Sequence, residues 1–200
     1  MNGLLLCESN SGKDHAMVSN MLKAILSLLI PVSVLAQREF PMPRQIDAAG
    51  FREVVAVSGD LYISGQPDSA AFVWLKADGV TTVINLRTSQ EMANRSFVPF
   101  DEQVLVEGLG MKFIHIPLGG PDTPYTPEAL RKFADTLKAA PGKVLLHCTV
   151  AWRASHMFAA YLIRYQGMPP AQAIAYARAV NFSALPVEGL LGKEMVIDFK

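Results

Sequence analysis

Cys148 and Arg153 stand five positions apart in the segment Val144–Ser155, VLLHCTVAWRAS, and this spacing could support nucleophilic chemistry. The apolar residues before the cysteine predict a buried strand, and the residues around and after the arginine predict a helix. Where a strand enters a helix, the first amides of the helix lack internal partners and attract anions. These amides and the guanidinium favour the thiolate form of the cysteine, and the guanidinium can bind two oxygens of an anion. The segment therefore predicts a nucleophile, oxyanion donors and a cation within one loop.

The remaining residues of this loop are expected to surround the same anion. We assign substrate binding to Thr149, Val150, Ala151, Trp152, Arg153 and Ser155. Ser155 could donate to the thiolate or be an ordinary first-turn serine, and Trp152 could line the pocket or pack against the sheet. His147 precedes Cys148 on the strand, so its side chain should point to the opposite face and orient the loop rather than act as a base. The alternative for the whole segment is a small core cysteine beside a solvated arginine.

Strands and helices are expected to alternate around this loop. Apolar and β-branched runs predict strands at 61–64, 81–86, 112–118 and 143–147, and helices are expected at 69–79, 101–110, 127–140, 154–166 and 170–180. The segment 193–199 could be a final strand or an extended arm. Asp68 and Thr126 are placed to cap two of these helices, with Pro127 at a first helical position. The alternation predicts an α/β fold with a central, mostly parallel sheet flanked by helices, formed by a single domain over residues 37–200. Ligands bind at the carboxyl ends of strands in such sheets, and Cys148 lies at that end.

With these elements in place, the chain resembles the cysteine-dependent protein tyrosine phosphatase superfamily. Within it, the resemblance is to the bacterial dual-specificity-phosphatase-like group, also called beta-lactamase-hydrolase-like. The matching segments are LYISGQPDSAAFVWLKADGVTTVINLR, FIHIPLGG and TPEALRKFADTLKAAPGKVLLHC, over roughly residues 57–166. The resemblance implies a phosphatase-like fold and hydrolysis of phosphotyrosine or a small phosphoester through a thiophosphate on Cys148. It also implies that Arg153 binds the phosphoryl oxygens and that a loop aspartate protonates the leaving oxygen.

Asp122, in GGPDTPY, is the candidate for that acid, because it lies on the loop after the strand that precedes the cysteine strand in sequence. A Gly- and Pro-containing loop can carry a carboxylate over a leaving group. The alternative is an aspartate that only stabilises its own turn. Asp101 and Asp135 are poorer candidates, because both are expected on solvated helices.

Two features depart from the superfamily pattern. The common phosphatase loop has five residues between cysteine and arginine, whereas this chain has four, Thr149 to Trp152. Rhodanese-type sulfurtransferases also use a short cysteine loop, so a persulfide carrier is an alternative function. Ala151 stands where related loops commonly have glycine, and a positive φ there would cost about 1 kcal/mol. A catalytically weak phosphate-binding module is therefore a third possibility.

The rest of the sequence limits the classes of function and partner. The formal net charge is zero, so neither nucleic-acid binding nor polybasic membrane binding is expected. The isolated histidines and the cysteine show no metal-ligand spacing, so we expect no metal and no cofactor. Residues 1–36 resemble an extension followed by a secretory signal that ends at Ala36, which predicts a periplasmic or secreted protein without stable membrane insertion after cleavage. Its expected partner is a phosphorylated protein or a small phosphoester.

Overall fold

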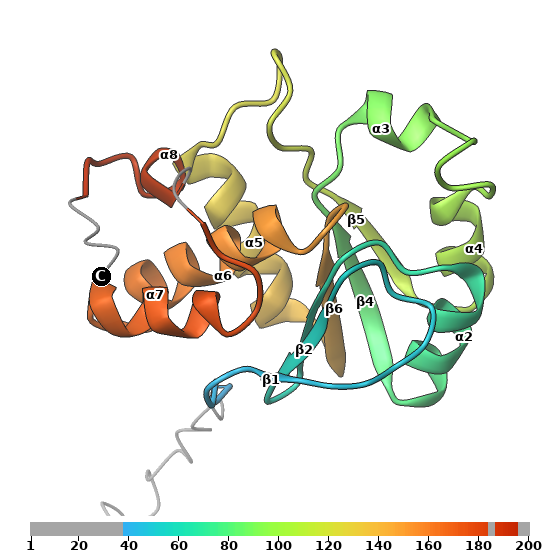
Figure 1. The fold of residues 1–200 in the computed structure, drawn as a ribbon, viewed down its shortest axis with the longest axis horizontal. Coiled ribbons are helices and arrows are strands. Elements are labelled where there is room, and N and C mark those ends of the chain that lie inside the picture. The colour runs from blue at the N-terminus through green and yellow to red at the C-terminus, as the bar shows by residue number, and fades with distance from the viewer. Residues whose placement is uncertain (1–37, 184–186, 196–200) are drawn as a thin grey trace, which may run out of the picture. The chain divides into compact units, whose positions relative to one another are not determined.

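Six strands form one mixed sheet in the order β1-β2-β3-β6-β4-β5, as the computed structural model shows for residues 38–183 and 187–195 (Figure 1). The strands are β1 (Arg44–Gln45), β2 (Val55–Ser58), β3 (Leu61–Ser64), β4 (Val80–Asn85), β5 (Lys112–His115) and β6 (Lys143–His147). β3, β6, β4 and β5 run parallel, whereas β1 and β2 add an antiparallel edge. The mostly parallel sheet confirms the predicted fold class.

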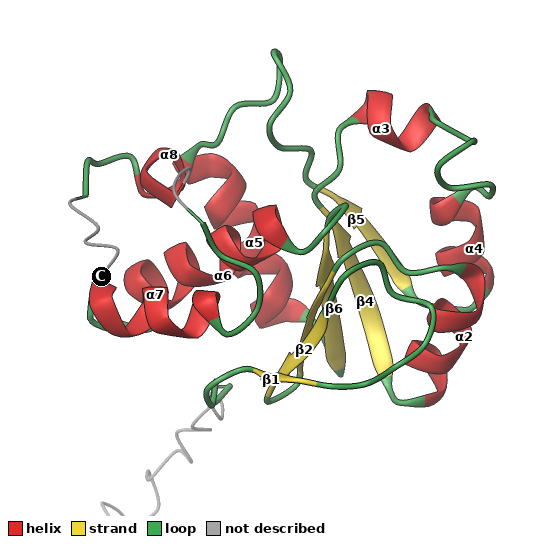
Figure 2. Ribbon diagram, in the orientation of Figure 1, coloured by secondary structure: helices red, strands yellow, loops and turns green. Residues whose placement is uncertain are grey.

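Helices cover both faces of the sheet (Figures 1 and 2). They are α2 (Ser69–Ala77), α3 (Ser89–Ala93), α4 (Glu102–Gly108), α5 (Pro127–Ala139), α6 (Trp152–Tyr165), α7 (Pro170–Arg178) and α8 (Val187–Leu191). The two leucines of β6 divide between the two sides: Leu146 packs in the core under α5 to α8, and Leu145 packs in the core under α2 and α4. Because side chains alternate along a strand, Cys148 belongs to the first core and His147 faces the second.

Local signals in the sequence explain several helix starts. The Oδ1 of Asp68 accepts a hydrogen bond from the Ala71 amide at 2.8 Å, and the Oγ1 of Thr126 accepts one from the Ala129 amide at 3.2 Å. Both caps satisfy amides that have no partner within the helix, as predicted. Pro127 occupies the first turn of α5, where its missing N–H costs nothing.

The structure also differs from the predicted elements. The first two strands, α3 and α8 were not predicted, because each is short and lacks a periodic apolar pattern. The strand expected over 112–118 ends at His115, although the Ile116 and Leu118 amides still donate to the Asn85 and Leu86 carbonyl oxygens at 2.9 and 3.1 Å. Helix α6 begins at Trp152, two residues earlier than expected, so Trp152 and Arg153 belong to the helix itself.

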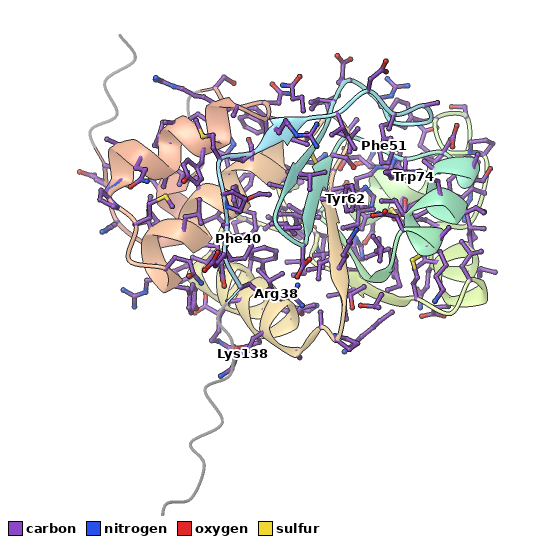
Figure 3. All side chains as sticks on the ribbon, turned by 90° about the horizontal axis from the view of Figure 1, so that it is seen from below. Arg38, Phe40, Phe51, Tyr62, Trp74 and Lys138 are labelled. Carbon is purple, nitrogen blue, oxygen red and sulfur yellow. The ribbon has the colours of Figure 1, made fainter. Side chains whose placement is uncertain are left out.

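Aromatic contacts secure the segments at the edges of the sheet. Trp74 of α2 packs edge-on against Phe51 and Tyr62, with ring centroids 6.1 and 5.7 Å apart (Figure 3). Phe40 packs edge-on against Phe158 and Tyr161 on the other side, 5.8 and 5.6 Å away.

Two predictions concern residues outside the described ranges. The extension and secretory signal over 1–36 lie there entirely, and the strand or arm expected over 193–199 lies there from residue 196 on. The division of the chain into a leader and one domain stays a prediction. Within residues 38–183 and 187–195, every helix is too short or too polar to cross a bilayer.

Candidate active site

Cys148 leaves the carboxyl end of β6 and is followed by a three-residue loop that enters α6. Its thiol is free, and the residue is only 1% exposed. Ala151 caps α6 with φ 64° and ψ −4°, and among the residues that the structure describes no side chain bonds the first amides of the helix. This positive φ is the strained conformation considered above for Ala151. It costs about 1 kcal/mol relative to glycine. The uncapped start of a 14-residue helix therefore faces the cysteine loop and is suited to an anion.

The carbonyl groups of the cysteine loop are held by residues outside it. The Thr149 carbonyl accepts from the Gln66 amide at 3.0 Å, and the Val150 carbonyl accepts from Asn181 Nδ2 at 2.6 Å. A Cβ on Gly65 would lie 1.8 Å from the Arg52 carbonyl oxygen, so only glycine permits this close approach. Within the described residues, the amides of Thr149 and Val150 donate to no other group of the protein. They remain available to a bound anion.

Arg153 lies in the first turn of α6, and five acceptors fix its guanidinium. Nη1 donates to the carbonyl oxygens of Leu86 and Leu118 at 3.2 and 2.9 Å and to Glu91 Oε2 at 2.7 Å. Nη2 donates to Glu91 Oε1 at 2.6 Å and to Thr149 Oγ1 at 3.0 Å. Within the described part of the chain, Nε has no protein acceptor. The arginine is thus oriented before any ligand arrives, and its Nε–H group is left for a ligand.

Glu91 is a site residue that the sequence reasoning missed. Its carboxylate also accepts from the Thr88 amide at 2.7 Å and from Thr149 Oγ1 at 2.8 Å. Burial raises the pKa of Glu91, but the hydrogen bonds from Arg153, Thr88 and Thr149 outweigh it and lower that pKa to about 2. The Thr88-x-x-Glu91 capping box at the start of α3 was a signal that could have identified the helix, although not its ion pair.

A buried polar network lies under the loop on the other face of the sheet. His147 Nε2 contacts Glu102 Oε1 at 2.9 Å, and Glu102 also accepts from Asn85 at 2.6 Å and Gln66 at 2.7 Å. Burial raises the pKa of Glu102, but His147 and the two amide donors hold it below its ordinary value. His147 therefore lies beneath the loop, as predicted. It shares Glu102 with Gln66, and the backbone N–H of Gln66 donates to the Thr149 carbonyl of the loop.

Arg87, from the VINLR segment, is a second arginine next to the site. It is 1% exposed, and its Nη1 donates to Gln66 Oε1 at 2.9 Å while its Nη2 donates to the Glu91 carbonyl. Burial lowers the pKa of Arg87, and the nearby carboxylates of Glu102 and Glu91 offset only part of this effect. Its guanidinium thus links the buried network to the helix that carries Glu91.

The hydroxyl of Ser155 contacts backbone carbonyl groups in the structure. Its Oγ lies 2.8 Å from the carbonyl oxygens of both Trp152 and Asn181, and the residue is fully buried. These contacts are those expected of the alternative, a first-turn serine, and its assignment to substrate binding stays a prediction. Trp152 is partly exposed and donates from Nε1 to Ser183 Oγ at 2.8 Å, at the edge of the loop. His156 is buried and contacts the Trp152 and Ser183 carbonyls, so it is structural, as expected.

Asp122 is exposed at the turn that connects β5 to α5. The Gly119 amide donates to the Thr123 carbonyl at 2.8 Å and the Thr123 amide donates to the Gly120 carbonyl at 3.1 Å, which places Asp122 inside a tight turn. Among the described residues, no group hydrogen-bonds the Asp122 carboxylate. The loop that contains it extends beyond the ends of the parallel strands (Figure 2). The contacts in the structure therefore do not bring the Asp122 carboxylate together with Cys148 and Arg153. Its role as an acid stays a prediction.

No cluster of three or more His, Cys, Asp or Glu side chains in residues 38–183 and 187–195 is arranged to hold a metal ion. The polar groups around Cys148 are arginines, amides, a threonine and a carboxylate that is paired with arginine. This set is suited to binding an oxyanion directly.

Comparison with known proteins assigns the fold and the family. A family model described as DSP-PTPase phosphatase fused to NAD+ kinase matches residues 47–189. A beta-lactamase hydrolase-like protein of Xylella fastidiosa is 29% identical over 107 residues, which is 54% of this chain and 24% of that protein. The chain therefore spans about a quarter of the length of that relative.

Solved structures give the same result for the fold. A DUF442 protein from Shewanella putrefaciens CN-32 aligns with a TM-score of 0.54 and 29% identity, covering 72% of this chain and 91% of that chain. The structure of P. aeruginosa TpbA in complex with pTyr aligns with a TM-score of 0.51 and 17% identity, covering 72% of this chain and 80% of that chain. The fold is that of the cysteine-based tyrosine and dual-specificity phosphatases.

Proposed function

The chain belongs to the DSP-PTPase family whose model is described as fused to NAD+ kinase, and from this membership we propose that it is a cysteine-dependent phosphatase acting on phosphomonoesters. The observation that carries the proposal is the oriented guanidinium of Arg153 in the first turn of α6, the helix that the cysteine loop enters. Glu91 holds this guanidinium, and the uncapped amides of α6 begin beside it. A phosphoryl group is the ligand that such a set of donors fits best.

In the proposed reaction, the Cys148 thiolate attacks phosphorus. An S–P bond forms, the P–O bond to the leaving group breaks, and Asp122 supplies the proton to the leaving oxygen. Water then loses a proton to the Asp122 carboxylate and attacks the thiophosphate, which breaks the S–P bond, releases phosphate and returns both the thiolate and the protonated acid. Arg153 and the loop amides stabilise the negative charge on the phosphoryl oxygens in both steps.

Phosphotyrosine is the first substrate to test, alongside small phosphoesters. TpbA, which shares the fold, binds pTyr in its crystal structure. The secretory signal expected in residues 1–36 would place the enzyme in the periplasm or outside the cell, and this location belongs to the proposal.

The experiment is hydrolysis of an aryl phosphate by the purified protein in the presence of a thiol reductant. We expect turnover by the native chain and none by Cys148→Ser, because the hydroxyl of serine is a far weaker nucleophile than a thiolate. Turnover that survives this substitution would contradict the proposal.

The spacing of four residues between Cys148 and Arg153 supports a sulfurtransferase as a second candidate, and the same preparation can distinguish it. Attack of the Cys148 thiolate on the outer sulfur of thiosulfate should then break the S–S bond, release sulfite and leave one added sulfur atom on Cys148, which intact-protein mass spectrometry would detect. An adduct with no phosphatase turnover would favour persulfide transfer. Binding of phosphate without turnover or adduct would favour a non-enzymatic binding module.

A further inference from the structure

Tyr125 occupies the loop between β5 and α5, three residues after Asp122, and its side chain reaches the Arg153 side of the site. A Cβ on Gly119 would lie 2.9 Å from the Tyr125 hydroxyl oxygen and 3.8 Å from Arg153 Cδ. The Tyr125 hydroxyl and the Arg153 side chain therefore both lie close to Gly119. Since the Leu118 carbonyl accepts from Arg153 Nη1 at 2.9 Å, hydroxyl and guanidinium share one side of the β5–α5 loop.

Two glycines leave room for Tyr125, one beside its hydroxyl and one beside its backbone. Gly119 has φ +87° and no Cβ, which leaves room for the hydroxyl. A Cβ on Gly189 of α8 would lie 2.8 Å from the Tyr125 carbonyl oxygen and 2.9 Å from Tyr125 Cβ. The next residue, Thr126, caps α5, so the backbone here is fixed by a helix start. The ring is half-buried against the core under α5 to α8 and has little freedom to move.

The hydroxyl is available as a donor. Among the described residues, it has no hydrogen-bond partner, and it is not one of the fully buried polar atoms, so a ligand can reach it. Burial raises the pKa of Tyr125, Arg153 lowers it, and the charges of Cys148 and Glu91 raise it further. The phenol therefore keeps its proton at neutral pH, and the interactions with Cys148 and Glu91 place it within electrostatic reach of the nucleophile.

We propose that Tyr125 is a further substrate-binding residue, whose O–H donates a hydrogen bond to a non-bridging phosphoryl oxygen held beside Arg153. This inference rests on the proposed phosphatase function and names one more contact of the same site. The neutral Tyr125 hydroxyl donates to the side of the anion that faces the β5–α5 loop. The amides of the cysteine loop and Arg153 donate to its other sides. Asp122, in contrast, is exposed at the turn and is left for the leaving oxygen.

The decisive experiment measures orthophosphate binding to the full chain by isothermal titration calorimetry, in a Cys148→Ser background so that no turnover interferes. Adding Tyr125→Phe should weaken orthophosphate affinity about tenfold, the size expected for loss of one hydrogen bond to a charged group. The matched control is Tyr165→Phe, which removes a hydroxyl from an exposed tyrosine at the end of α6 and should leave the affinity unchanged. Unchanged affinity in Tyr125→Phe, or no binding to the parent protein, would overturn the inference.

Kinetics with the native cysteine locate the contact. Tyr125→Phe should lower kcat/KM about tenfold for aryl phosphates with good and with poor leaving groups alike, because a non-bridging oxygen is present in both. A loss confined to poor leaving groups would contradict the assignment to a non-bridging oxygen. If the native protein shows no turnover, the proposed function fails, yet the calorimetry still decides the role of Tyr125.

Discussion

Glu91 and Arg153 form a bidentate ion pair across 62 residues of sequence, with Nη1–Oε2 at 2.7 Å and Nη2–Oε1 at 2.6 Å. The pair joins the short helix after β4 to the first turn of α6. Because two carbonyl groups and Thr149 hold the same guanidinium, Arg153 is directed toward the cysteine loop before a ligand binds.

Glu91→Gln should lower both activity and stability. The amide keeps the shape of the side chain but loses the charge that orients Arg153, so we expect kcat/KM for an aryl phosphate to fall about 10- to 100-fold. The free energy of unfolding should fall by about 1–2 kcal/mol, allowing for the partial exposure of the pair. Glu107→Gln, on an exposed position of α4, is the control. Wild-type kinetics in Glu91→Gln would show that the ion pair does not position the arginine.

The same pair should make stability depend on pH. The pKa of Glu91 is about 2 in the folded protein, below the ordinary value of 4.5, so the folded state favours the ionised form. Its contribution is complete above pH 4.5 and is lost as pH falls toward 2. The difference in unfolding free energy between wild type and Glu91→Gln, measured in urea at several pH values, should stay constant at neutral pH and shrink below pH 4.5. A difference that grows on acidification would contradict the assignment.

Ala151 tests the strain in the cysteine loop. Ala151→Val places a β-branched residue at φ 64° in a fully buried position and should cost about 2–4 kcal/mol of stability. Ala151→Gly should change stability by less than about 1 kcal/mol, because relief of strain offsets the loss of a buried methyl group. Urea unfolding of both variants checks the contrast. Equal stability of the two would mean that the positive φ imposes no constraint.

Glu102 should matter for folding rather than for chemistry. Glu102→Ala leaves His147, Asn85 and Gln66 without their shared acceptor in the core, so we expect a loss of about 3–5 kcal/mol. Chemical denaturation measures this loss, and Glu107→Ala on the same helix gives the cost of an exposed substitution. Comparable values for the two variants would show that the buried network adds no stability.

Asp122→Asn tests the leaving-group acid. Protonation matters most when the leaving oxygen is strongly basic, so kcat should fall at least about tenfold for alkyl phosphates and change little for nitrophenyl phosphate. The ratio of the two rates is the measurement. An equal loss with both substrates would remove Asp122 as the acid, and Asp135→Asn on the solvated face of α5 is the control.

The sequence determined the elements whose signals are local. Four parallel strands, the caps at Asp68 and Thr126, and the placement of Cys148 where β6 enters α6 all follow from apolar runs, caps and turns within about fifteen residues. The face of His147 also followed, because alternation along a strand depends on no distant residue.

Only the tertiary structure decided which distant side chains meet at the cysteine loop. Arg87 and Glu91 follow β4 and Tyr125 lies in the β5–α5 loop, and nothing in their local sequence specifies that they gather around Arg153, 28 to 66 positions away. The structure also showed that Ser155 bonds backbone carbonyls and that Ala151 adopts a positive φ. Ion pairs and close packing contacts of this kind depend on which chain segments the folded sheet brings side by side. A single sequence carries no periodic pattern from which such pairings can be derived.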